Sequence, residues 1–227
     1  MKITAAEKVR TRERIVETAA RLFMKNGWDK TTTRSIAAAS GIATGKLFNY
    51  YESKEAIVAS LMSEALQEAQ EEVKKRQRGD EALEEELFSL IWTELRSLKR
   101  FQKFLPAAAE TILSPMRCLS TGSPGEELRE NHLKAVEQII IAHGISDSLS
   151  PVMLQLYWTL YLGVFAHWAT DTSPKQEDTL ALLDQTLTLF VSALDREQKG
   201  QKDHERKSQR SHGRASTRTR RHRSSRG

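Results

Sequence analysis

One stretch of seven residues carries the side chains with the clearest chemistry in this chain of 227 residues. Residues 44–50, TGKLFNY, include several hydrogen-bond donors and no acidic residue. Helical spacing would place Thr44, Lys46 and Asn49 on one outer face, with Tyr50 at its end. A helix with such a face fits the major groove of DNA, where side-chain donors read base edges.

Gly45 lies on the same face, although a glycine inside a helix costs about 1 kcal/mol relative to alanine. We expect its missing side chain to let the backbone approach DNA; the alternative is that the helix simply tolerates a glycine. Arg34 before this stretch and Lys54 after it are placed to reach phosphates. Phosphate contacts supply affinity and register rather than sequence choice.

Two short helices joined at Gly41 would position these residues as a helix-turn-helix. The threonines at 31–33 offer an N-cap for a first helix that runs to about Ser40, and a second helix spans about residues 44–50. Gly41 can adopt a positive φ in the turn between them at little cost. The small core between the two helices is expected from Ile36, Ala37, Ile42 and Leu47.

Longer helices flank this pair. The preceding helix ends at Asn26-Gly27, where the glycine supplies a left-handed stop. Ser53 has the position of an N-cap for the following helix, which runs to about Gln77 with Glu55 in its first turn. No stretch shows convincing strand periodicity, so the sequence predicts an all-α fold.

The stretch TTTRSIAAASGIATGKLFNYYESKEAI, residues 31–57, resembles the N-terminal DNA-binding domain of TetR-type transcriptional regulators. The resemblance covers about residues 8–60. It implies three N-terminal helices that hold the helix-turn-helix, and a larger C-terminal helical domain that binds a small ligand and dimerises through its last two helices. It also implies a repressor that binds a palindromic operator as a dimer and leaves it when ligand binds. The alternative is a ligand-independent or activating regulator of the same fold.

The resemblance also assigns roles to individual residues. It places Thr33, Arg34 and Lys54 at phosphates, Thr44, Lys46 and Asn49 at bases, and Tyr50 at bases or backbone. Two positions depart from the family pattern. Phe48 stands where the family usually has tyrosine, and Tyr51, expected to pack inward, stands where it usually has phenylalanine.

Charge divides the chain into three parts. Residues 1–60 carry 11 Lys/Arg and 6 Asp/Glu, residues 61–198 carry 13 and 22, and residues 199–227 carry 11 and 2. Basic ends around an acidic middle point to a polyanion partner for the ends, unless the charges merely solubilise the surface. We therefore expect a helix-turn-helix DNA-binding domain over 1–53, a ligand-binding and dimerisation domain over 54–198, and a disordered basic tail over 199–227.

The last two helices are candidates for a dimer seam. Residues 148–170 contain no formally charged residue, which favours a buried helix over the alternative of a membrane span of about 20 residues. The helix from Asp178 to about Asp195 carries apolar residues spaced 3, 4, 3, 4, the pattern of helices packed in a bundle. The seam is expected from Leu180, Leu183, Leu187, Phe190 and Leu194.

The acidic middle contains large side chains that could line a pocket for a small hydrophobic ligand, although core packing explains each of them as well. These side chains are Trp92, Phe101, Phe104, Met116, Trp158, Tyr161 and Phe165. The histidines lack the spacing of metal ligands, and the single cysteine, Cys118, excludes an internal disulfide or a CxxC metal site. We expect no metal and no cofactor.

Two other classes of protein compete with a DNA-binding regulator. A helical enzyme would need a nucleophile–base pair, a phosphate loop or a metal motif, and the sequence shows none of them. A scaffold protein built on the leucine-rich last helix would leave the acid-free stretch 44–50 unexplained. The first ten residues contain no apolar core of secretion-signal length. We therefore expect a cytoplasmic, non-enzymatic homodimer that binds double-stranded DNA and no membrane.

Overall fold

The computed structural model describes residues 4–114, 122–145 and 148–223, with side chains described as far as residue 200. All regular elements in these ranges are helices, which confirms the all-α prediction. The expected pocket residue Met116 and the single Cys118 lie outside the described residues.

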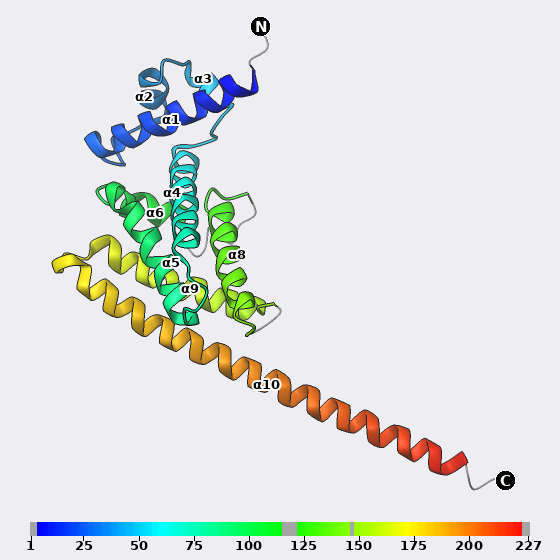
Figure 1. Cartoon of the computed structure of the whole chain (residues 1–227). Coiled ribbons are helices and arrows are strands. Elements are labelled where there is room, and N and C mark those ends of the chain that lie inside the picture. The colour runs from blue at the N-terminus through cyan, green and yellow to red at the C-terminus, as the bar shows by residue number, and fades with distance from the viewer. Residues whose placement is uncertain (1–3, 115–121, 146–147, 224–227) are drawn as a thin grey trace.

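A head of three helices is followed by a larger helical body (Figure 1). The head comprises α1 (Ala5–Asn26), α2 (Thr33–Ala39) and α3 (Thr44–Leu47). The body comprises α4 (Lys54–Arg76), α5 (Leu83–Leu98), α6 (Leu105–Ile112), α8 (Glu126–Ala142), α9 (Pro151–Thr170) and α10 (Glu177–Arg223). Short 3₁₀ turns, η1 (Lys99–Phe101) and η2 (Pro174–Gln176), precede α6 and α10.

Local capping chemistry sets the helix boundaries around the head. Gly27, with φ 84°, ends α1, and its N–H donates to the Phe23 carbonyl. Thr32 caps α2 by accepting a hydrogen bond from the Ser35 N–H. Ser53 caps α4 by accepting from the Ala56 N–H at 3.1 Å. The stops and starts predicted at Gly27 and Ser53 are therefore confirmed.

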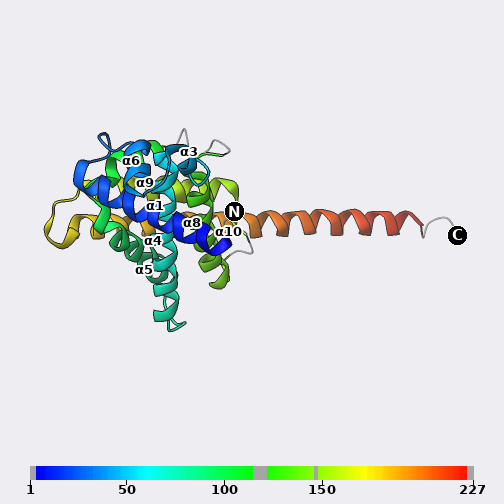
Figure 2. The ribbon, with the colours of Figure 1, turned by 90° about the horizontal axis from the view of Figure 1, so that it is seen from above.

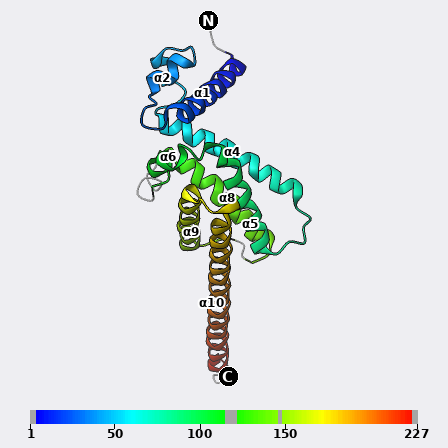
Figure 3. The same ribbon diagram turned by 90° about the vertical axis from the view of Figure 1, so that its left-hand side faces the viewer.

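Helix α4 joins the head to the body. It packs along α5 and also reaches α1, α6 and α8. Helix α10 packs on α9 and α5 and then leaves the body (Figure 2). Figure 3 shows the head at one end of the molecule and the free part of α10 at the other.

Two predicted elements differ in length. Helix α3 ends at Leu47, and the chain tightens into i→i−3 bonds as the N–H groups of Asn49 and Tyr50 donate to the carbonyls of Lys46 and Leu47. The segment expected as a disordered tail continues α10 as far as Arg223. Residues 177–223 contain no proline to end the helix.

No helix within the described part of the chain is long and apolar enough to cross a membrane. Helix α9 instead buries one side in the body, including Met153, Tyr157, Trp158 and Trp168. The interpretation of residues 148–170 as a helix packed in the protein core agrees with the burial of this side.

Candidate nucleic-acid interface

The turn between α2 and α3 is closed by two backbone hydrogen bonds. The N–H of Gly41 donates to the Ala38 carbonyl at 3.1 Å, and the N–H of Ile42 donates to the Ala37 carbonyl at 3.0 Å. This pair of bonds is a Schellman motif, which needs a left-handed residue at its centre, and Gly41 has φ 69°. The glycine therefore fixes the angle at which α3 leaves α2.

A small apolar core holds α3 against the rest of the head. Ile36 and Leu47 have no exposed surface, and Ala37 and Tyr51 are buried beside them. Ile42 is half-buried against the same core. The residues predicted to support the second helix therefore do so, which leaves its opposite face free.

Helices α1 and α4 hold the chain just after α3. The Tyr51 hydroxyl lies 3.2 Å from the Ser60 hydroxyl on α4, and the Arg12 guanidinium on α1 lies 5.2 Å above the Tyr51 ring. Burial raises the pKa of Tyr51, so this phenol stays neutral. Arg12 also donates to the Tyr50 carbonyl at 3.4 Å. The backbone that follows α3 is thus tied to two longer helices.

The outer face of α3 and its following turn presents the predicted donors. Gly45, Lys46 and Asn49 are exposed, and Thr44 and Tyr50 are half-buried. Arg34 is exposed in the first turn of α2, with Thr33 half-buried beside it. The structure brings these residues to one side of the head; their contacts with bases and phosphates stay predictions.

Lys54 has a partner that the sequence did not predict. Its ammonium donates to the Trp28 carbonyl at 3.0 Å and lies 4.0 Å from the centre of the Trp28 ring. This contact ties the start of α4 to the loop after α1. Lys54 therefore has a structural role inside the head, and a phosphate contact would use its remaining protons.

Phe48 is a further candidate for contact with DNA. The sequence analysis noted it only because it departs from the family pattern. Its side chain is 49% exposed, directly after the fully buried Leu47. An exposed apolar side chain beside base-reading donors suits the methyl group of thymine. The exposure of Phe48 could have been predicted from the sequence, because Leu47 was expected in the core and the next residue of a helix projects to a different face.

A groove of about 740 Å³ borders the same segment and separates it from α8. Asn49 and Tyr50 are among its lining residues, and Arg12 is the positively charged residue among those that the structure describes there. Five carboxylates line it: Glu52, Glu64, Glu126, Glu127 and Glu130. This charge repels phosphates, so the surface of the head that suits DNA ends at Tyr50.

Comparison with known proteins identifies the head. Residues 15–61 match the family model of bacterial regulatory proteins, tetR family. Residues 15–61 therefore form a TetR-type DNA-binding domain. Over 49 residues it is 43% identical to the uncharacterized HTH-type transcriptional regulator YerO of Bacillus subtilis. That match spans 22% of this chain and 17% of YerO.

Solved structures of TetR regulators share the fold over 79% to 81% of this chain. Thermus thermophilus FadR, a TetR-family repressor in complex with lauroyl-CoA, superposes with a TM-score of 0.63 at 24% identity, over 79% of this chain and 93% of FadR. A TetR regulator from Rhodococcus sp. RHA1 gives a TM-score of 0.63 at 18% identity, over 81% and 97% of the two chains. The matched proteins are transcriptional regulators, not enzymes, in agreement with the sequence prediction.

The body of the protein places its expected pocket residues in two groups. Trp158, Tyr161 and Phe165 form one aromatic row on α9, with ring centres 5.3 and 6.5 Å apart along the row. Phe101 and Phe104 lie elsewhere, at the start of α6. Trp92 on α5 is half-buried. Whether the six described candidates line one ligand site stays a prediction.

Phe104 belongs to a joint between the body and the head. Its ring centre lies 5.1 Å from that of Phe23, near the end of α1. Lys103 next to it donates from its ammonium to the Met24 carbonyl at 2.7 Å. We call these four residues the α1–α6 joint.

The residues predicted for the dimer seam lie on the inward face of α10. Leu183, Leu187, Phe190 and Leu194 are at most 2% exposed, and Leu180 is half-buried, because this stripe packs on α9 and α5 of its own chain. A side chain without exposed surface cannot contact a second subunit.

The exposed apolar side chains of α9 and α10 lie on another stripe. We call Val152, Leu156, Leu182 and Leu189 the outer stripe; their exposed fractions are 74%, 37%, 37% and 65%. Leu182 and Leu189 are seven residues apart, so they share a helix face. Both stripes of α10 have bundle spacing, and only packing shows which one is free.

Proposed function

We propose that the protein is a dimeric repressor that binds a palindromic operator and leaves it when a small ligand binds in the body. The observation that carries the DNA-binding part is the exposed, acid-free face of residues 44–50, held rigidly by a buried support within a TetR-type domain. Rigid support matters because base readout depends on donors held within hydrogen-bond reach of base edges.

Base and phosphate contacts divide between different residues in this proposal. Thr44, Lys46, Phe48 and Asn49 face base edges in the major groove, and Tyr50 faces bases or backbone. Thr33 and Arg34 contact phosphates at the start of α2. Gly45 lets the α3 backbone approach the groove wall, because no side chain stands between them.

The outer stripe supports association of two subunits. Its four apolar side chains occupy neighbouring helices, and an exposed apolar surface of this kind is typical of a protein–protein contact. A two-fold dimer through α9 and α10 presents two heads, and two heads read two half-sites of a palindrome.

The ligand response is supported by the course of α6. This helix begins at the α1–α6 joint and carries Leu105 and Ile112 into the core of the body. A ligand that displaces α6 would therefore displace Phe104 and Lys103, and with them the end of α1. Thermus thermophilus FadR, whose fold is similar, is in complex with lauroyl-CoA, and this supports a ligand response.

Binding to the protein's own upstream DNA tests the proposal. The dissociation constant would be measured over a range of salt concentrations against that duplex and against a random duplex of equal length. We expect tighter binding to the upstream duplex at every salt concentration, and a stoichiometry of one dimer per palindrome. Equal affinity for both duplexes at all salt concentrations would contradict sequence-specific binding.

A promoter–reporter assay tests the direction of regulation. Deleting the gene for a repressor raises transcription from the operator-bearing promoter, whereas deleting the gene for an activator lowers it. We expect a rise.

A further inference from the structure

Arg12 of α1 connects the end of the candidate base-reading stretch to the acidic groove beside it. We call residues 44–50 the reading segment. The Arg12 guanidinium donates to the Tyr50 carbonyl at 3.4 Å and lies 5.2 Å above the Tyr51 ring. Arg12 also lines the groove of carboxylates between the head and α8. A cation in this place restrains the backbone at the end of the reading segment.

A chain of hydrogen bonds leads from Tyr51 to a carboxylate on α4. The Tyr51 hydroxyl lies 3.2 Å from the Ser60 hydroxyl, and the Ser60 hydroxyl donates to the Glu64 carboxylate at 3.5 Å. Because Ser60 donates to Glu64, its oxygen is left to accept a hydrogen bond from Tyr51. A negative charge at the end of the chain strengthens both bonds. Arg12 and Glu64 are therefore the two charged ends of one network.

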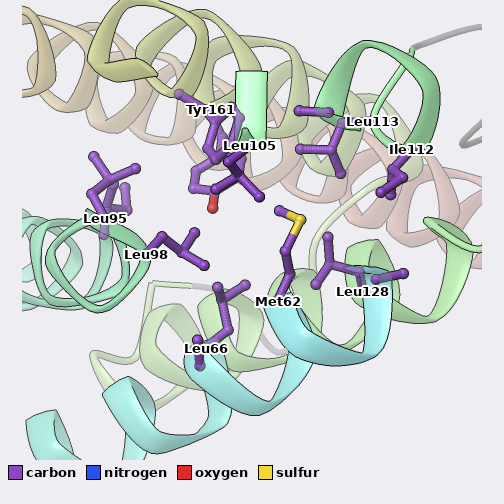
Figure 4. Close-up of a cluster of buried hydrophobic side chains, with 14 of the residues drawn as sticks. Met62, Leu66, Leu95, Leu98, Leu105, Ile112, Leu113, Leu128 and Tyr161 are labelled. Carbon is purple, nitrogen blue, oxygen red and sulfur yellow. The ribbon is translucent and has the colours of Figure 1, made fainter. Parts of the chain in front are cut away.

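Helix α4 gives this network a fixed support. Its residues Met62 and Leu66 point into a cluster of buried side chains that several helices of the body contribute (Figure 4). Ser60 and Glu64 each precede one of these residues by two positions and lie on the side of α4 that borders the groove. The body thus holds one side of α4, and the other side presents Glu64 to the head.

The charge of Glu64 depends on its surroundings in the groove. Burial raises the pKa of Glu64, and the carboxylates of Glu68 and Glu13 raise it further. The Ser60 hydrogen bond and the Arg12 guanidinium lower this pKa in part. Because Arg12 favours the charged form of Glu64, charged Glu64 by reciprocity favours Arg12 in its observed position.

Other charged groups near Glu64 do not replace Arg12 in this role. Those that line the two grooves bordering Glu64 are Glu17, Arg21, Glu52, Glu68, Arg100, Glu126, Glu127 and Glu130. Arg100 lies 3.8 Å from Glu68, and Arg21 donates to a hydroxyl on its own helix at 3.1 Å. Among the described residues of these grooves, this leaves Arg12 as the cation at the end of the network.

We propose that Arg12 is a positioning residue for operator recognition, and that the charge of Glu64 sets how firmly Arg12 holds the Tyr50 carbonyl. The inference rests on the proposed reading of bases by residues 44–50. Charged Glu64 keeps Arg12 in place, so the reading segment is rigid and discriminates between duplexes. Protonation of Glu64 removes this attraction, so discrimination falls on acidification.

Arg12→Gln tests the positioning role. The full-length variant would be titrated with the upstream duplex and with a random duplex of equal length over a salt series. We expect the ratio of the two affinities to fall about two- to tenfold, the range of one hydrogen bond, with an unchanged salt dependence. Partial unfolding would instead lower both affinities alike. An unchanged ratio, or the lower salt dependence that follows loss of a phosphate contact, would overturn the proposal.

The pH dependence of the same ratio tests the role of Glu64. Residues 1–60 contain no histidine, so no imidazole of the head changes charge between pH 5 and pH 8. We expect the wild-type ratio to be highest at pH 8 and to fall towards pH 5. Glu64→Gln mimics the protonated carboxyl, so its ratio should lie about two- to fivefold below wild type at pH 8 and stay constant on acidification.

Glu68→Gln is the matched control, because it removes the same charge one turn later on α4. Its ratio should equal that of wild type at pH 8 and should still fall on acidification. The fall should occur at lower pH, since Glu68 raises the pKa of Glu64. A wild-type ratio that is independent of pH, or a Glu64→Gln ratio that falls as the wild-type ratio does, would refute the role of Glu64.

The two duplexes also separate this inference from the proposed function. Wild-type protein that prefers its upstream duplex, with the same preference in Arg12→Gln, would retain the repressor proposal and lose the positioning role. Wild-type protein without any preference between the duplexes at any pH would lose both.

Discussion

The fold itself gives no reason for a glycine at position 45. Its φ lies outside the left-handed region, and a Cβ atom built there would have no neighbour within 4 Å. Neither backbone conformation nor internal packing therefore requires a glycine at this position. The face that it occupies is exposed, and we propose the approach of DNA as the reason for the missing side chain.

Gly45→Ala should therefore separate stability from binding. Alanine favours the helix by up to about 1 kcal/mol, so the melting temperature should stay or rise, while operator affinity falls because the methyl group stands between α3 and the DNA. Thermal unfolding and gel-shift titration measure the two effects. Gly41→Ala is the control, since φ 69° at Gly41 makes that change destabilising. Wild-type operator affinity in Gly45→Ala would show that DNA does not approach this backbone.

Asn49 and Arg34 should differ in the kind of binding energy that they supply. Asn49→Ala should lower discrimination at particular base pairs by about 1–3 kcal/mol, measured with a panel of single-base operator variants. Arg34→Ala should instead weaken all duplexes alike and reduce the salt dependence of binding. Equal losses on every duplex for both variants would contradict this division.

Lys54 is less suitable than Arg34 for testing phosphate contacts by substitution, although both residues are predicted to make them. Its ammonium holds the Trp28 carbonyl, so Lys54→Ala would weaken the head as well as any contact with DNA. The sequence pattern places a lysine at the start of α4 but contains no information on the carbonyl that it binds. Such a contact spans 26 positions and appears only when the helices are assembled.

At the scale of elements, the turn between α9 and α10 depends on one carboxylate. Asp171 accepts hydrogen bonds from the N–H groups of Ser173 at 2.7 Å and Thr179 at 3.0 Å. Hydrogen bonds from the Ser173 and Thr179 groups hold the pKa of Asp171 far below its usual range. The turn is thereby fixed in the geometry that starts α10 beside α9.

Asp171→Ala should lower the melting temperature at neutral pH. Because the folded-state pKa is depressed, the stabilising contribution is present above the unfolded value of 3.8 and is lost as pH falls through the folded value. The difference in melting temperature between wild type and Asp171→Ala should therefore be constant from about pH 5 to pH 8 and shrink below about pH 4. Calorimetry at several pH values measures it. A difference that grows on acidification would contradict the assigned hydrogen bonds.

Capping residues made most helix boundaries predictable, because a cap acts through hydrogen bonds within a few residues. Gly27 and Ser53 were located from sequence for this reason. The length of α3 was overestimated, since donors and apolar spacing persist to Tyr50 while the backbone has already tightened after Leu47. The free face of α10 was also misassigned, because the choice between two apolar stripes depends on what packs against them.

At the scale of the whole molecule, the two leucine stripes of α10 should respond differently to substitution. Leu189→Glu should convert the dimer to a monomer of normal helicity, because Leu189 is 65% exposed and a charge there opposes an apolar contact. Leu187→Ala should instead lower stability by about 2–5 kcal/mol, because Leu187 is 2% exposed and its loss leaves a cavity. Light scattering and urea unfolding distinguish the two outcomes.

Gln138→Glu is the control for the added negative charge of Leu189→Glu. It places the same charge on the exposed face of α8 and should leave the dimer intact. Dimerisation of Leu189→Glu with wild-type affinity would remove the outer stripe from the interface.

The C-terminal part of α10 adds a charge effect that the head alone does not explain. Residues 199–227 carry 11 Lys/Arg against 2 Asp/Glu, and α10 leaves the body at the end opposite the head (Figure 3). Basic residues outside the base-reading face attract any duplex alike. We expect this segment to contribute to non-specific binding of nucleic acid, with no part in operator choice or in the dimer contact.

Deleting residues 199–227 should therefore lower affinity for random duplex and reduce its salt dependence, while the ratio of operator to random affinity rises and the dimer persists. Replacing the arginines of this segment by glutamine at constant length should reproduce the loss, because the effect depends on charge and not on chain length. Fluorescence anisotropy over a salt series measures both quantities. Unchanged affinity for random duplex in both variants would show that the basic segment does not bind nucleic acid, and the positive charge relevant to DNA would then be that of the head.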